Sequence, residues 1–150
     1  MEICLIEKEV RPSELMEALL LVWESSVRAT HDFLRKGDVE FLQPYVEQGL
    51  KEIPVLLCAF EEGHPLAFLG MAEDSIEMLF VHAESRDKGI GSTLMRAALS
   101  RGASKVDVNE QNPQALGFYQ RFGFEVVSRD DVDSLGLPYP ILHCSLPEKA

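Results

Sequence analysis

The sequence predicts one α/β (α+β) domain over residues 1–150, and three observations lead to this fold class. The chain has the length of a single typical domain, enough to bury about two-thirds of its unfolded surface. Hydrophobic residues make up 46% and charged residues 26% of it, as in ordinary soluble globular proteins. Segments with the period of strands alternate with segments with the period of helices, and no repeat, low-complexity tract or linker separates them.

In chain order, the expected elements are a strand (2–7), a helix (12–27), a second helix (38–52), three strands (55–61, 65–73 and 75–82), a helix (90–101), a strand (105–109), a helix (113–122) and two strands (124–129 and 141–146). Pro12-Ser13-Glu14 is a typical helix start, and the apolar residues after it recur at helical spacing. Asp38 is expected to cap the second helix, and Pro54 to end it.

The central and C-terminal elements are separated by clear turn signals. Turns at 62–64 and 73–74 predict that the three central strands pair consecutively and antiparallel. Asn112 is a good helix N-cap because Pro113 then takes the first helical position. A proline-rich loop joins the last two strands.

Residues 86–91, Arg-Asp-Lys-Gly-Ile-Gly, form a glycine-rich turn between a strand and a helix. The first backbone N–H groups of such a helix have no partner within it. With the positive end of the helix dipole, they make a site for a phosphate or pyrophosphate. Gly89 and Gly91 let the backbone approach the anion and adopt positive φ where needed. The chain contains no Gly-Lys-Ser/Thr, which excludes a P-loop, and Leu94 stands where a dinucleotide fingerprint needs its third glycine.

Two short motifs carry a resemblance to a known family. The first is Arg/Gln-x-x-Gly-x-Gly/Ala, matched by Arg86, Gly89 and Gly91. The second is Asn-x-x-Ala-x-x-Phe-Tyr-x-x-x-Gly-Phe, matched by Asn112, Ala115, Phe118, Tyr119, Gly123 and Phe124. Their separation fits one helix and one strand. The chain is therefore similar to the GNAT superfamily of acyl-CoA-dependent N-acetyltransferases.

The resemblance covers nearly the whole chain. Residues 29–34 and 133–140 look like the small bacterial YjaB-type branch of the superfamily. The family fold implies a central mixed, mostly antiparallel sheet of about seven strands flanked by about four helices. Two positions depart from the commonest pattern: Ala83 replaces a frequent proline, and Asp87 replaces a frequent glycine and puts a negative charge beside the expected pyrophosphate.

The resemblance also implies the ligands. Acetyl-CoA would be the co-substrate, and transfer would be direct, in a ternary complex, to a peptide or protein lysine or a small amine. The alternative is a non-catalytic module that senses acyl-CoA. The His31-Asp32-Phe33 segment would border the acceptor site. The residues expected to bind acetyl-CoA are Leu79, Phe80, Val81, Arg86, Asp87, Lys88, Gly89, Ile90, Gly91, Ser92, Asn109, Asn112, Ala115, Phe118 and Tyr119.

Acetyl transfer needs an acid for the departing thiolate and a base for the amine, whose free pKa near ~10.4 leaves it charged at neutral pH. The matching family position makes Tyr119 the expected acid. Glu77 is the first candidate for the base, directly or through water, because a carboxylate within an apolar strand is unusual and can have a raised pKa. By strand alternation Glu77 should share a face with Leu79 and Val81. Asp107, on the next strand, is the alternative base.

The net charge of −11 argues against general nucleic-acid binding. Its distribution is uneven. Residues 86–105 hold five basic residues and one acidic residue, whereas the other 130 residues hold nine basic and 24 acidic ones. Positive charge therefore gathers around the expected phosphate turn, and the acidic remainder can attract a cationic amine or a basic peptide.

Apolar runs, cysteines and histidines limit where the protein can be located and which cofactors it can use. No apolar run approaches the ~20 residues that cross a bilayer, and no signal peptide is visible. The three cysteines lack Cys-x-x-Cys spacing and are expected to be reduced thiols: Cys4, Cys58 and Cys144. His64, His82 and His143 show no metal-ligand spacing. We therefore expect a cytoplasmic enzyme, monomeric or homodimeric, that uses no metal, membrane or nucleic acid.

Overall fold

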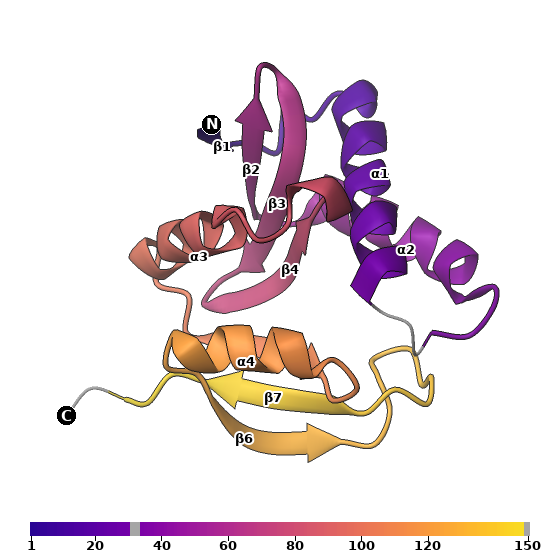
Figure 1. The fold of residues 1–150 in the computed structure, drawn as a ribbon, viewed down its shortest axis with the longest axis vertical. Coiled ribbons are helices and arrows are strands. Elements are labelled where there is room, and N and C mark those ends of the chain that lie inside the picture. Colours follow the sequence, from indigo (N-terminus) through magenta and orange to yellow (C-terminus); the bar gives the residue numbers. More distant parts are fainter. Residues whose placement is uncertain (31–33, 149–150) are drawn as a thin grey trace.

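The structure, a computed structural model, describes residues 1–30 and 34–148, and it is built around one seven-stranded sheet (Figure 1). The strands are β1 (Glu2–Leu5), β2 (Val55–Glu61), β3 (His64–Ala72), β4 (Ser75–Val81), β5 (Lys105–Asn109), β6 (Glu125–Asp130) and β7 (Ile141–Ser145). The helices are α1 (Ser13–Thr30), α2 (Asp38–Glu52), α3 (Ile90–Ser100) and α4 (Pro113–Arg121), with a short 3₁₀ turn η1 (Ala83–Ser85). The predicted element order and the mixed α+β architecture are confirmed, and η1 is the one described addition.

The strand order is β1-β2-β3-β4-β5-β7-β6. Neighbouring strands are antiparallel except β4 and β5, which are parallel and are connected by α3. Parallel neighbours need such a crossover, because a tight hairpin can only reverse the chain. The sheet is therefore mixed and mostly antiparallel, as the sequence predicts.

Helices cover both faces of the sheet, so the interiors of β2 and β3 are apolar on both faces. On β2, Leu56 and Cys58 pack with buried residues of α1 and α2, whereas Leu57 and Ala59 pack with those of α3 and α4. Trp23 of α1 anchors the first cluster. Full burial of one large apolar side chain contributes about 1.5–3 kcal/mol, and these two clusters hold the helices on the sheet.

A β-bulge at Glu77 interrupts the alternation of β4. In the pairing of β4 with β3, Met78 lies opposite Gly70 and Ile76 lies opposite Met71, so Glu77 is the extra residue. Ile76 consequently packs with Leu79 on the α3 side, while Met78 packs on the α1 side. Ile76 and Leu79 therefore share a face although they are three residues apart, because a bulge inserts one residue and interrupts the period of two. That Glu77 shares this face stays a prediction.

The sheet parts between β4 and β5. These strands pair only at Ser75 with Lys105 and at Ile76 with Val106. Among the described residues, no strand pairs with the edge of β4 that continues from Glu77 to Val81 on this side. Backbone N–H and C=O groups are therefore left available along both strands beyond the last pair.

The start of α2 corrects another expectation. Its N-cap is Gly37, with φ 90°, and not Asp38, which is the first helical residue. The Asp38 carboxylate instead accepts hydrogen bonds from the Arg35 backbone N–H at 2.9 Å and from the Tyr139 hydroxyl. Asp38 thus ties α2 to the loop between β6 and β7. Of the helices that the structure describes, none is long and apolar enough to cross a membrane.

Candidate active site

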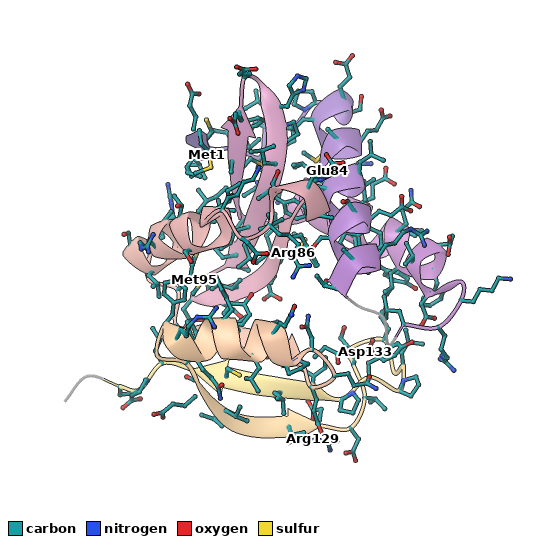
Figure 2. The ribbon with its side chains drawn as sticks, viewed as in Figure 1. Met1, Glu84, Arg86, Met95, Arg129 and Asp133 are labelled. Carbon is teal, nitrogen blue, oxygen red and sulfur yellow. The ribbon has the colours of Figure 1, made fainter. Side chains whose placement is uncertain are left out.

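A cleft of about 520 Å³ opens where β4 and β5 part. Its two long walls are the free edges of these strands, and α4, the glycine turn and α1 complete it. In Figure 2 the Arg86 side chain lies near the middle of the view, with α3 on one side, α1 on the other and α4 below. The lining residues are Ser26 and Thr30, residues 76–81, Arg86, Asp87, Gly91, residues 106–109, Asn112, Gln114, Ala115, Phe118, Tyr119 and Arg121.

The glycine turn leaves the start of α3 open. Gly89 is the N-cap with φ 78°, and no side chain caps the helix. The first N–H groups of α3 are therefore available to an anion, as the motif predicts. Gly91 has no positive φ, and a Cβ there would meet Phe118 and Val81 at 3.7 Å, an ordinary contact. Of the two glycines, only Gly89 needs its conformational freedom.

Part of the predicted turn faces the cleft and part does not. Arg86, Asp87 and Gly91 line it. Ile90 is buried in the core, so only its backbone can reach a ligand. Lys88 and Gly89, on the turn, and Ser92, in the first turn of α3, lie outside the lining residues.

The cationic side of the cleft includes residues that sequence reasoning missed. The Arg86 guanidinium donates to the Gln114 side-chain oxygen at 3.2 Å and so links the turn to α4. The Arg121 guanidinium lies 6.0 Å from the centre of the Phe118 ring, within cation–π range. Neither Gln114 nor Arg121 belongs to a motif, and only the packing of α4 against the turn brings them to the cleft.

Tyr119 lies on the buried face of α4. The helix starts as predicted, because the Asn112 side chain accepts from the Ala115 N–H at 3.2 Å. The Tyr119 ring packs edge-on against Phe118 and Phe124, at centroid distances of 5.3 and 5.9 Å. Burial, and then the nearby Cys144, raise the pKa of the Tyr119 hydroxyl, so the phenol stays protonated at neutral pH. A protonated phenol therefore lines the cleft.

Two carboxylates, Glu77 and Asp107, line the same cleft from β4 and β5. Burial, and then the neighbouring charge of Asp107, raise the pKa of Glu77 above that of an ordinary glutamate. A raised pKa makes the Glu77 carboxylate a better proton acceptor than an ordinary glutamate. The structure thus places both candidate bases in one cleft.

The predicted pantetheine-binding residues lie along the free strand edges. Leu79, Phe80 and Val81 line the cleft, and on this stretch β4 pairs only with β3 among the described elements. Asn109 lines it from the end of β5, where its side-chain oxygen accepts from the Gln111 N–H at 2.8 Å. An amide-bearing arm can add to such an edge as a further strand would.

Other predicted residues fall outside this geometry. His31, Asp32 and Phe33 lie outside the described residues. Ser26 and Thr30, which sequence reasoning did not single out, line the cleft from the end of α1, just before that segment. Among residues 1–30 and 34–148, no group of three or more His, Cys, Asp or Glu side chains could hold a metal ion.

The site as a whole defines a class of protein. An uncapped helix start suits a pyrophosphate, free strand edges suit an amide-bearing arm, and a protonated phenol beside two carboxylates suits proton transfers. Together these features define an acyl-CoA-dependent transferase.

Known proteins support the same class. The acetyltransferase (GNAT) domain family matches residues 28–139. Peptidyl-lysine N-acetyltransferase YjaB of Salmonella typhimurium is 38% identical over 132 residues, 87% of this chain and 91% of that protein. The solution structure of apo-form YjaB from Escherichia coli is 37% identical, covers 97% of both chains and has a TM-score of 0.84. PaiA N-acetyltransferase of Thermoplasma acidophilum in complex with coenzyme A shares the fold, with 21% identity, a TM-score of 0.68 and coverage of 95% of this chain and 98% of that one.

The chain belongs to the GNAT family of acetyltransferases. It is an acetyl-CoA-dependent N-acetyltransferase, with acetyl-CoA as co-substrate and an amine as acceptor. The predicted resemblance to the YjaB-type branch is confirmed. In this structure the glycine turn and the strand edges fit the pyrophosphate and the pantetheine arm of such a co-substrate.

Proposed function

We propose that this protein acetylates lysine side chains of peptides or proteins, by direct transfer in a ternary complex with acetyl-CoA. One observation carries the proposal: the uncapped start of α3, the Tyr119 phenol and the carboxylates of Glu77 and Asp107 border a single cleft. The relative named peptidyl-lysine N-acetyltransferase supports a lysine acceptor. The acidic character of the chain outside residues 86–105 suits a cationic acceptor.

The co-substrate is proposed to lie along the cleft from the turn to β5. The N–H groups at the start of α3, with Arg86 and Lys88, bind the pyrophosphate; residues 89–92 contribute their backbone. The edge of β4 at 79–81 pairs with the pantetheine amides. Asn109, Asn112, Ala115 and Phe118 bind the remainder, and residues 31–33 border the acceptor.

The proposed chemistry follows from the groups at the carboxylate end. The acceptor ammonium loses a proton to Glu77 or Asp107, directly or through water. The neutral nitrogen then attacks the thioester carbon, an N–C bond forms and the C–S bond breaks. Tyr119 donates its proton to the departing thiolate. The acylated nitrogen releases its second proton to solvent as the amide forms, and the Tyr119 phenolate takes a proton back from solvent. Each proton has a named donor and acceptor, and no metal is needed.

We further propose that residues 1–150 act as one catalytic domain, monomeric or homodimeric, in the cytoplasm and without nucleic-acid partners. The net charge of −11 supports the last point, since binding to phosphate backbones relies on neutralising them with Lys and Arg.

The test combines binding with turnover. Acetyl-CoA is titrated calorimetrically, and CoA release is then followed with a thiol reagent across lysine peptides and small amines. The matched control is the same peptide with arginine in place of lysine. We expect release that requires the lysine peptide. Tight acetyl-CoA binding without acceptor-dependent release on a broad panel would instead identify a sensor, and release only with small amines would exclude the peptide acceptor.

A further inference from the structure

His143 joins two carboxylates from neighbouring strands into one hydrogen-bonded chain. Its Nδ1 lies 2.7 Å from Asp107 Oδ1, and its Nε2 lies 2.7 Å from Asp130 Oδ2. His143 is the middle residue of β7, directly opposite Asp107 on β5, while Asp130 ends β6 on the other side. The chain of contacts therefore leads from Asp107, which lines the cleft and has a side chain 62% exposed, across three strands to Asp130.

The charged surroundings of His143 are mostly acidic. Asp107 faces it from β5, Asp130 faces it from β6, and Glu77 of β4 interacts with Asp107 across the cleft. The nearby cations have other partners: Arg129 of β6 pairs with Glu110 and Asp131, and Lys105 of β5 lies 3.7 Å from Asp74 (Figure 2 labels Arg129). Within the described residues, His143 thus links Asp107 to Asp130 without a competing cation in contact.

A lone carboxylate is poorly matched to the proposed reaction. An aspartate has a pKa near ~3.9 and a lysine ammonium near ~10.4, so the transfer of a proton between them is strongly unfavourable. An imidazole has a pKa near ~6.5 and is a much better acceptor. A histidine that stands behind the carboxylate can therefore reduce the mismatch if the two are hydrogen-bonded.

We propose that His143 is a positioning residue that acts through Asp107: the proton removed from the acceptor ammonium passes by way of Asp107 to His143, and leaves for solvent through Asp130. The inference rests on the proposed function and assigns the base role to Asp107 rather than Glu77. Asp130, with a side chain 68% exposed, is open to solvent at the outer end.

The proton balance is complete. Neutral His143 holds its proton on Nε2, donated to Asp130, so its Nδ1 is free to accept from Asp107 once that carboxylate has taken up a proton. An N–H bond of the acceptor ammonium breaks, the proton reaches the Asp107 carboxylate and moves on to Nδ1. The resulting imidazolium releases its Nε2 proton through Asp130. Exchange with solvent then returns the remaining proton from Nδ1 to Nε2 before the next turnover. No oxidant, metal or further reactant is required.

The electrostatics agree with this path. The hydrogen bonds to Asp130 and Asp107 raise the pKa of His143 above the ordinary histidine value. The imidazole is therefore protonated below this raised pKa and cannot accept, and it becomes competent as the pH rises through it. Activity should rise over the same pH interval.

The test compares pH profiles with a direct titration of His143. Acetylation is measured as kcat/KM for the acceptor at saturating acetyl-CoA in wild type, H143Q, D130N and D131N, and ¹⁵N NMR follows the His143 imidazole. Glutamine can still donate a hydrogen bond from its side-chain amide nitrogen to one of the two aspartates, but it cannot titrate. D131N is the matched control, because Asp131 pairs with Arg129 and is not a partner of His143.

In the wild type, we expect kcat/KM to rise with pH around the same midpoint as the His143 titration seen by NMR. H143Q should lose that midpoint and fall roughly tenfold in kcat/KM at neutral pH, with acetyl-CoA affinity unchanged. D130N should shift two pH midpoints downward together, that of the His143 titration and that of the rise in kcat/KM. D131N should shift neither. If circular dichroism shows that H143Q does not fold, the comparison of D130N with D131N tests the proposed proton path instead.

Two results would overturn the proton path through His143 but not the proposed function. One is an active H143Q variant with the wild-type pH profile. The other is a D130N variant in which the NMR midpoint of His143 shifts while the pH dependence of kcat/KM does not. The second result would leave His143 as a structural contact between strands. A wild-type protein that binds acetyl-CoA but acetylates no amine would instead refute the proposed function, and the proton path with it.

Discussion

At one end of the cleft, Arg86 and the uncapped start of α3 present positive charge; at the other, Glu77, Asp107 and the His143 contacts present negative charge. The first end comes from one continuous segment and acts largely through backbone N–H groups. The second end is assembled from four strands, and it acts only through side chains. The comparison separates affinity from chemistry: damage to the turn should weaken binding of acetyl-CoA, whereas damage to the opposite end should slow turnover.

The largest expected effect tests the chemical end. Tyr119→Phe keeps the ring between Phe118 and Phe124 but removes the hydroxyl, so packing is preserved. If the phenol protonates the thiolate, kcat should fall roughly 10²-fold, with little change in acetyl-CoA affinity. The measurement is steady-state turnover, alongside calorimetric binding. Near wild-type turnover, under conditions where chemistry limits the rate, would leave Tyr119 as a packing residue only.

The next effect tests the turn. Gly89 has φ 78° in open space, so Gly89→Val strains the backbone by about 1–2 kcal/mol and covers the anion site. We expect the Kd for acetyl-CoA to rise at least about tenfold, since one such loss is ~1.4 kcal/mol. Gly102→Val is the matched control, because Gly102 has φ 94° in equally open space just beyond the other end of α3.

The two glycine variants should lose similar stability in thermal unfolding, but only the first should lose binding. Equal acetyl-CoA affinity in both folded variants would remove the turn from the co-substrate site and end the contrast between the two ends of the cleft.

The contact between Tyr139 and Asp38 lies at neither end of the cleft, so its loss should affect stability and not binding or turnover. Tyr139→Phe removes the hydroxyl that donates to Asp38 and should lower the free energy of unfolding by about 1–2 kcal/mol. That bond lowers the pKa of Asp38, so its contribution is present above the unfolded pKa near ~3.9 and is lost as the pH falls through the folded value. Urea unfolding of both proteins at pH 7 and in acid should show the difference shrinking. A constant difference would mean that the contact is not coupled to Asp38 ionisation.

The smallest expected effect comes from removing the one negative charge of Asp87 at the cationic end of the cleft. Asp87 lines the cationic end and has φ 63°, a left-handed conformation that asparagine also tolerates. Asp87→Asn removes the negative charge and keeps the shape, so acetyl-CoA should bind roughly threefold more tightly at low salt, and the gain should shrink as salt screens it. Calorimetry at two ionic strengths measures this. A salt-independent gain would point to backbone relaxation rather than charge.

Sequence reasoning identified the elements and the turn because their signals are local. Residues 86–91 contain the strand end, the glycine of positive φ and the helix start within a single segment, and Asn112-Pro113 caps α4 by contacts three residues apart. It misplaced the N-cap of α2 by one residue, because Gly37 rather than Asp38 adopts the required conformation. It also could not detect the bulge at Glu77, which exists only in the register of β4 against β3.

By itself, the sequence determined the order of strands and helices, the family and the glycine turn before α3, since hydrophobic period, caps and glycine turns act over a few residues. Only the tertiary structure decided where β4 and β5 part, that Gln114 and Arg121 reach the cleft, and that His143 meets Asp107 and Asp130. The physical reason is distance along the chain. His143 lies 36 residues from Asp107 and 13 from Asp130, and their contacts depend on strand register, which no local pattern specifies.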